Sequence, residues 1–108
     1  MKKKFTSLLL ALLFALPALA QRFEYDGLWY NVLDEEAKTC EVVKNNDVNV
    51  EDLIIPTTAY YQGAYSVTTI GEYAFGGCSS LASVVIPRSV TTIGDWAFWD
   101  CTELAAVG

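Results

Sequence analysis

The fold follows from one stretch of sequence, Val67-Thr-Thr-Ile-Gly-Glu-Tyr-Ala-Phe-Gly-Gly-Cys-Ser-Ser-Leu-Ala-Ser-Val84. It aligns without a gap on Val90-Thr-Thr-Ile-Gly-Asp-Trp-Ala-Phe-Trp-Asp-Cys-Thr-Glu-Leu-Ala-Ala-Val107, and eleven of the eighteen pairs are identical. The period is 23 residues. Self-similarity at such a period is the sequence signature of a solenoid, in which each unit stacks on the next. We therefore predict a β-rich repeat solenoid.

The matched positions separate a predicted core from a predicted surface. Apolar or small residues recur at six positions, and equivalent positions of successive coils stack into ladders. The predicted core residues are Ile70, Ala74, Phe75, Cys78, Leu81 and Val84, with their partners Ile93, Ala97, Phe98, Cys101, Leu104 and Val107. The substituted pairs Glu72/Asp95, Gly77/Asp100 and Ser80/Glu103 are expected to face water.

Local signals predict how each unit runs. Residues 81–86 form a short strand that Pro87 ends, and residues 90–93 form a second β segment. Residues 72–75 and 95–99 each have an acid at their start, which favours one helical turn. Gly71 and Gly94 follow an isoleucine, where we expect a positive φ that only glycine adopts cheaply.

At these residues the chain resembles the BspA-type leucine-rich repeat surface proteins, whose unit runs Ile-Gly-x-x-Ala-Phe-x-x-Cys-x-x-Leu-x-x-Val-x-Ile-Pro-x-x-Val. The resemblance covers residues 53–108. It implies an exported bacterial solenoid that presents a surface to a partner, with adhesion to host or microbial surface proteins as the expected role. It also implies that Cys78 and Cys101 form a buried thiol ladder. A disulfide is the alternative, because stacked coils lie about 5 Å apart.

The segments before the two copies are less regular. Leu53-Ile-Ile-Pro56 matches Val84-Val-Ile-Pro87 and opens a partial unit, in which residues 57–66 are an insertion that forms a loop or a pair of lengthened strands. Residues 21–52 alternate around an Asp26-Gly27 turn and a charged turn at 34–38, which predicts an N-terminal β-hairpin cap. We place the repeats at 53–108 and expect Cys40 to be a thiol in the cap, since the odd number of cysteines leaves at least one unpaired.

Residues 1–20 are typical of a cleavable secretory signal peptide. Three lysines precede an apolar run, Pro17 breaks that run, and Ala18 and Ala20 are small residues at the −3 and −1 positions. We predict cleavage after Ala20, and therefore a secreted or cell-surface protein. Cleavage leaves four basic residues against thirteen acidic ones, a formal charge of −9. Such a domain is poorly suited to nucleic acids or anionic membranes, and we expect no membrane insertion after cleavage.

The sequence contains no pattern of catalytic side chains that indicates an enzyme. It has no histidine, which excludes Ser-His and Cys-His nucleophilic systems. Asn45-x-Asp47-x-Asn49-x-Glu51 alternates oxygen ligands, but Val50 stands where an EF-hand loop needs glycine, so we interpret it as a polar loop. We predict no catalytic residue, metal ligand or cofactor.

Aromatic side chains remain as the candidate contacts with a partner. Tyr60, Tyr61 and Tyr65 lie in the insertion, Trp99 lies in the second copy, and aromatic residues are enriched in binding hot spots. Trp96 shares its repeat position with Tyr73, which favours packing between coils. The predicted function is a non-enzymatic binding module for a protein; the alternatives are a structural cap segment of a larger surface protein and a glycan-binding domain.

The second copy stops at Val107 without the Ile-Pro that follows in the first. Either the chain is a piece of a longer protein or its last coil is exposed. An unpaired strand edge with apolar neighbours is a template for association. In the second case we expect self-association through this open coil.

Overall fold

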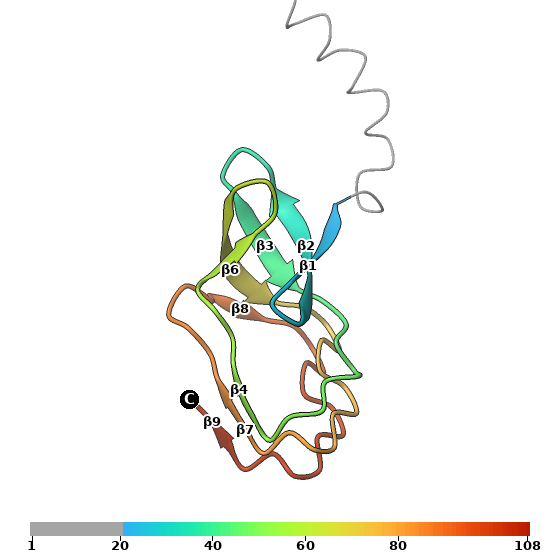
Figure 1. Cartoon of the computed structure of the whole chain (residues 1–108). Helices are drawn as coiled ribbons and strands as arrows, with labels where there is room; N and C mark the ends of the chain where they lie inside the picture. Colours follow the sequence, from blue (N-terminus) through green and yellow to red (C-terminus); the bar gives the residue numbers. More distant parts are fainter. Residues whose placement is uncertain (1–20) are drawn as a thin grey trace, which may run out of the picture.

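The computed structural model describes residues 21–108, and the predicted signal peptide lies outside them. These residues form two sheets (Figure 1). The larger has the order β1-β2-β3-β6-β5, with β8 paired to β6, and the smaller has the order β4-β7-β9. The strands are β1 (Arg22–Tyr25), β2 (Leu28–Asp34), β3 (Thr39–Val42), β4 (Asp52–Ile54), β5 (Thr58–Tyr60), β6 (Ala64–Ile70), β7 (Ser83–Val85), β8 (Thr92–Ile93) and β9 (Ala106–Val107).

Successive coils stack through parallel strand pairs on two sides. β3, β6 and β8 stack in one sheet, and β4, β7 and β9 stack in the other. Between the sheets the chain zigzags through a run of turns, which follow one another down one edge of the molecule (Figure 1). The register places Ile70 beside Ile93 and Val84 beside Val107. Equivalent residues of the two copies are therefore neighbours, and the predicted leucine-rich repeat solenoid is confirmed.

The turn edge contains no helix within residues 21–108. Local bonds join residues three apart, as from the Ala74 N–H to the Gly71 carbonyl at 3.2 Å. The N–H groups of alternate residues donate to the next coil instead. The Phe75 N–H, for example, donates to the Ala97 carbonyl at 2.8 Å. Tyr73 and Trp96 have φ angles of 58° and 61°, which a right-handed helix does not allow. The prediction of helical turns was therefore wrong, because the chain bonds laterally at this edge.

Gly71 and Gly94 are needed for space and not for a positive φ, so our expectation for them was wrong. Neither is among the residues with positive φ. A Cβ on Gly71 would lie 2.8 Å from the Val42 carbonyl oxygen, and one on Gly94 would lie 2.6 Å from the Glu72 backbone nitrogen. Both distances are too short for a carbon atom, because the backbones of neighbouring coils approach closely there.

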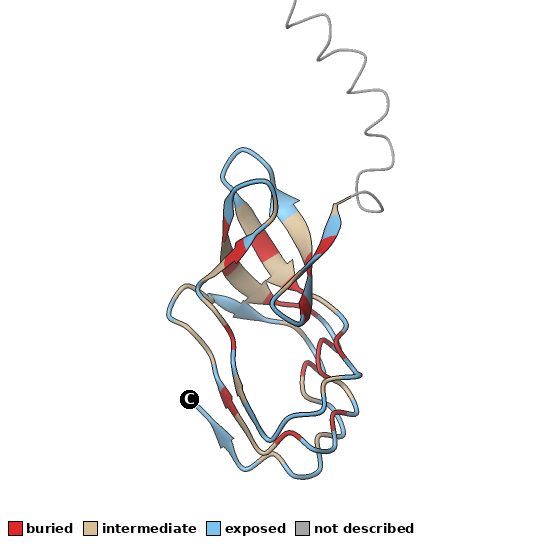
Figure 2. Cartoon of the chain, viewed as in Figure 1, coloured by how far each residue is buried: buried red, intermediate tan, exposed pale blue. Residues whose placement is uncertain are grey.

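The buried residues lie along both sheets and along the turn edge between them (Figure 2). The first copy is buried as predicted, and in the second copy Ala97 is buried while Phe98, Cys101 and Leu104 are half-buried against the core. The Phe75 and Phe98 rings stack at 5.5 Å. Ile93 and Val107 are 50% and 52% exposed, so the prediction that they are core residues was wrong. Within residues 21–108 no further coil covers that side.

The cysteines of the two copies form a ladder of hydrogen-bond donors. The Cys78 Sγ lies 3.2 Å from the Asn45 carbonyl oxygen, and the Cys101 Sγ lies 3.0 Å from the Phe75 carbonyl oxygen. Both thiols are free, as is that of Cys40 in the cap. Burial raises the pKa of Cys78 and Cys101, and it raises that of Cys40 to about 12. The thiols therefore keep the protons that they donate.

The N-terminal strands form the predicted antiparallel cap. Asp26 and Gly27 have φ angles of 49° and 90°, as a two-residue hairpin turn of type I′ requires, and join β1 to β2. The inserted residues 57–66 form a second hairpin from β5 and the start of β6. Because β3 pairs with β6 in parallel, the cap continues directly into the stack of coils. The boundary at residue 53 stays a prediction.

Asn45 links the cap to the first coil through hydrogen bonds. Its sequence context did not indicate this role. Its side chain is buried; Oδ1 accepts the Trp29 N–H at 2.9 Å, and Nδ2 donates to the carbonyls of Trp29 at 3.2 Å and Val43 at 2.6 Å. Its own N–H donates to the Ala74 carbonyl at 2.6 Å. The amide thus satisfies backbone groups that would otherwise be buried without partners.

Replacing Gly94 with alanine tests the close approach of the coils. We expect the Gly94→Ala variant to lose about 1–3 kcal/mol of unfolding free energy, because the added methyl group meets backbone that cannot move aside. Urea denaturation measures the loss. The control is Gly76→Ala: a Cβ on Gly76 would lie 3.5 Å from its nearest neighbour, an ordinary contact, and Trp99 holds the same repeat position in the second copy. Equal stability of the two variants would contradict the close packing.

Replacing Asn45 with alanine tests the link between the cap and the first coil. We expect a loss of about 1–3 kcal/mol, since the truncation leaves buried backbone groups of Trp29 and Val43 unpaired. The neighbouring Asn46 is exposed, so Asn46→Ala is the matched control and should change stability by less than about 0.5 kcal/mol. Hydrogen exchange at the Trp29 N–H should rise in the first variant alone; unchanged protection there would refute this role.

Candidate binding surface

The inserted hairpin does not present its tyrosines together. Tyr65 is buried, and Tyr61 is half-buried and stacks on Phe23 at 4.9 Å. Phe23 also stacks on Tyr30 at 5.3 Å, so these rings form the core of the cap. Only Tyr60 is exposed, beside Tyr25 at 5.4 Å. The expectation of exposure was wrong for Tyr65, because it points inward from β6 while Tyr60 lies at the outer end of β5.

A different group of aromatic residues gathers on the turn edge. Trp99 is 52% exposed, as expected of a candidate contact, and it is joined by Trp96 at 58% and Tyr73 at 40%. The Tyr73 ring stacks on that of Trp96 at 6.3 Å and meets that of Trp99 edge-on at 6.3 Å. We call these three residues the aromatic turn surface. Trp96 packs against the preceding coil, as its repeat position favours, but it remains on the surface and is not buried in the core.

The backbone holds two of these rings at an energetic cost. Tyr73 and Trp96 occupy the left-handed region, where a bulky side chain costs about 1–2 kcal/mol relative to the ordinary conformation. Glycine or asparagine adopts this conformation more cheaply. Because Tyr73 and Trp96 are still 40% and 58% exposed, burial offsets only part of the cost. Such strain is a reason to suspect function.

Each ring of the aromatic turn surface has an exposed carboxylate beside it in the sequence. Glu72 precedes Tyr73, Asp95 precedes Trp96, and Asp100 follows Trp99. Neither turn segment, 71–82 or 94–105, contains a lysine or arginine. The surface therefore combines electron-rich rings with negative charge.

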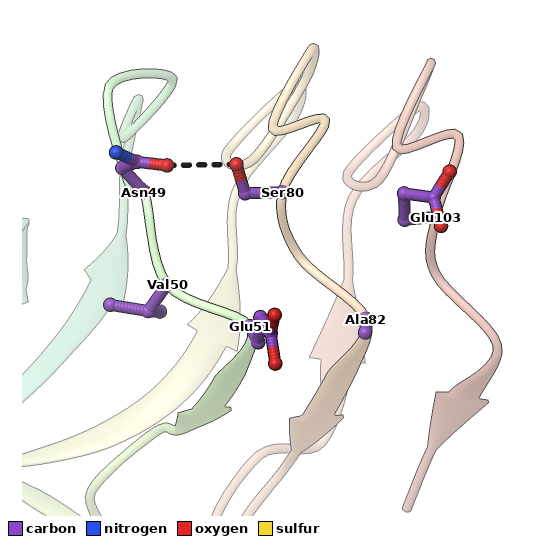
Figure 3. Close-up of a pocket in the computed structure, with 6 residues that line it drawn as sticks. All are labelled: Asn49, Val50, Glu51, Ser80, Ala82 and Glu103. Atoms are coloured by element: carbon purple, nitrogen blue, oxygen red, sulfur yellow. Dashed lines mark hydrogen bonds between the residues drawn. The ribbon is translucent and has the colours of Figure 1, made fainter.

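A shallow hollow lies on the neighbouring flank, between the turn edge and the strands β4, β7 and β9 (Figure 3). Its volume is about 550 Å³, and its lining residues are Asn49, Val50, Glu51, Ser80, Ala82 and Glu103. The Ser80 hydroxyl donates to Asn49 Oδ1 at 2.8 Å and so joins two neighbouring coils. Glu51 and Glu103 are exposed, so neither has the apolar surroundings that general acid catalysis by a carboxyl group requires.

Two further findings concern residues 21–108. They contain no group of three His, Cys, Asp or Glu side chains that could hold a metal ion. None of their elements is a helix long and apolar enough to cross a membrane.

The comparisons with known proteins agree with this architecture. The model of the BspA type leucine-rich repeat region matches residues 45–107. The chain belongs to this family. No curated protein matches it.

Solved structures of bacterial leucine-rich repeat proteins are similar to this chain. One from Bacteroides ovatus is 33% identical with a TM-score of 0.70 over 80% of this chain, and a leucine-rich cell surface protein from Faecalibacterium prausnitzii is 29% identical with a TM-score of 0.71 over 81%. A third, from Bacteroides capillosus, is 25% identical with a TM-score of 0.70. The chain spans 23% of the first two proteins and 64% of the third.

Membership of the BspA-type family points to a class of function. Leucine-rich repeat domains generally mediate protein–protein interaction and are typically non-enzymatic, and BspA-type proteins are typically at the bacterial surface or secreted. Neither the family match nor the similar structures indicate a catalytic family.

Trp99 is identifiable as a surface residue from the sequence, whereas Tyr73 and Trp96 are not identifiable by their repeat position. That shared position favours packing between coils, but residues outside a coil stack on their equivalents just as those inside do. A usable signal was present in the sequence. Tyr73 and Trp96 differ between copies and each follows an acid, unlike the identical apolar residues of the core.

Proposed function

We propose that this protein is an exported, non-enzymatic module that binds a protein, with the aromatic turn surface as its contact. The observation that carries the proposal is the exposure of Tyr73, Trp96 and Trp99 together on one edge. Exposed aromatic clusters are characteristic of interaction sites, and tryptophan and tyrosine are among the residues that dominate binding energy. Adhesion to a surface protein of a host or another microbe is the role that fits a BspA-type module.

The structure weakens the basis for a glycan site in the inserted hairpin. That hypothesis needed several exposed tyrosines, and of the three in the insertion only Tyr60 is exposed. A purely structural role, with binding left to other repeats, gives no reason for bulky rings at strained positions of an exposed edge. Protein binding accounts for both the exposure and the strain.

Export is tested by the N-terminus of the protein recovered outside the cytoplasm. We expect Gln21 as the first residue, determined by mass spectrometry of the intact protein, because Ala18 and Ala20 fit the recognition site of signal peptidase. The variant Ala20→Arg, with a large charged side chain at the cut, should accumulate uncleaved. An extracellular protein that retains residues 1–20 would refute cleavage at this point.

Binding is tested on immobilised panels of matrix and microbial surface proteins, with a glycan array alongside. We expect saturable binding to one or more proteins, weakened at least tenfold in a Trp96→Ala, Trp99→Ala double variant, since hot-spot aromatics contribute about 2 kcal/mol or more each. Trp29→Ala is the control, because Trp29 is an exposed tryptophan of the cap, at 38%, and is not part of the aromatic turn surface. Binding confined to glycans, or an equal loss in the control, would contradict the proposal.

A further inference from the structure

We infer that the aromatic turn surface binds a basic polypeptide segment, with arginine side chains stacked on its rings. This inference rests on the proposed function and names the chemistry of its partner. It starts from the alternation of rings and carboxylates along the edge: Glu72-Tyr73, Asp95-Trp96 and Trp99-Asp100. All six side chains are exposed.

The face of an aromatic ring attracts a cation, and tryptophan does so most strongly. A carboxylate next to the ring adds a second attraction for the same charge. Two of the three pairs contain tryptophan, and the Tyr73 and Trp96 rings are nearly parallel, at 12°. The edge therefore offers stacked π faces flanked by anionic groups, an arrangement complementary to side chains that are both flat and positively charged.

Cations within the chain already occupy other rings. The guanidinium of Arg22 lies 5.8 Å from the centroid of the Trp29 ring, and the ammonium of Lys38 lies 5.0 Å from that of Tyr65. The first contact lies in the N-terminal cap, and the second joins the cap to the inserted hairpin. Among the described residues no lysine or arginine contacts the rings of the aromatic turn surface in this way, and the turn segments contain none. The surface is thus left for a cation from outside.

Charge separates this partner from a neutral glycan. A sugar also stacks on tryptophan and can donate its hydroxyl groups to a carboxylate, but a neutral sugar carries no charge that the carboxylates attract. Residues 21–108 have a formal charge of −9, which accelerates the approach of a basic segment and disfavours an acidic one. The carboxylates beside the rings therefore favour a basic polypeptide.

Arginine should bind better than lysine. Its guanidinium is planar, stacks on a ring over its whole face and still directs N–H groups sideways to a carboxylate. The lysine ammonium is a compact, strongly hydrated charge that loses more water on contact with a ring. A preference for arginine at equal charge therefore distinguishes ring stacking from simple attraction between opposite charges.

The test is isothermal titration calorimetry of the protein with synthetic peptides. The first peptide has three arginines, each separated from the next by Gly-Ser. Matched peptides replace the arginines with lysine, with glutamate or with citrulline, which keeps the shape of arginine without its charge. A neutral oligosaccharide of glucose is the final titrant, and every titration is repeated at 0.05 M and 0.5 M salt.

We expect the arginine peptide to bind about three- to tenfold more tightly than the lysine peptide, and the citrulline and glutamate peptides not to bind measurably. Trp96→Ala should weaken arginine binding about 3- to 30-fold, the range that one cation–π contact provides. Asp95→Asn, which leaves the rings intact, should weaken it less, and high salt should do so as well. Trp29→Ala and Asp34→Asn are the controls in the cap, and both should bind as the parent does.

Equal binding of the citrulline and arginine peptides would overturn the inference, as would binding of the oligosaccharide alone. So would an equal loss in the cap variants. Unchanged circular dichroism and melting of Trp96→Ala show that it folds; if they change, Asp95→Asn and the peptide series decide. A protein that binds the surface-protein panel through Trp96 and Trp99 but ignores the arginine peptide would keep the proposed function and refute this partner.

Discussion

Backbone hydrogen bonds between successive coils are the constraint on which the rest of the structure depends. They run through both sheets, and they also run along the turn edge, where the N–H groups of Tyr73, Phe75 and Gly77 donate to Asp95, Ala97 and Trp99. With bonds on three sides, one coil cannot slip relative to the next. Every repeat position must then lie on its own equivalent, and side-chain ladders such as that of Phe75 and Phe98 follow directly.

The same lateral bonding explains which polar groups appear inside. At the turn edge the carbonyls of Asn45 and Phe75 each accept a local N–H, from Val48 at 3.3 Å and from Cys78 at 3.2 Å, and each can accept a second donor from the next coil. The carbonyls of Asn45 and Phe75 each receive the thiol of a cysteine. A thiol suits this place because it is small and apolar enough for the core, and because burial raises its pKa so that it stays a donor. Asn45 performs the related task where the cap meets the first coil.

The repeat made the stacking of the coils predictable, but it did not distinguish buried side chains from exposed ones. Identical residues such as Leu81 and Leu104 pointed correctly to the core, whereas the pair Tyr73 and Trp96 stacks equally well on the surface. The spacing of Ala74, Phe75 and Cys78 resembles that of a helix, and only the lateral bonds and the φ of Tyr73 exclude one. Likewise Tyr60 and Tyr65 are separated by the pairing of β5 with β6, a register that composition does not determine. The exposure of Ile93 and Val107 depends on what lies beyond their coil, which the period alone cannot show.

The positions that differ between the two copies are not the positions that form the core. Seven of the eighteen pairs differ between the two copies, and none of those residues is buried in either copy. Since the inward ladders and close backbone contacts constrain only the other positions, a surface residue can change in one repeat without disturbing the next. Gly76 is replaced by Trp99 in this way, which adds a third ring to an edge whose backbone is otherwise repeated. A solenoid of this kind can thus vary its exposed side chains one repeat at a time while its core stays the same, because the hydrogen bonds that hold the coils in register join backbone atoms.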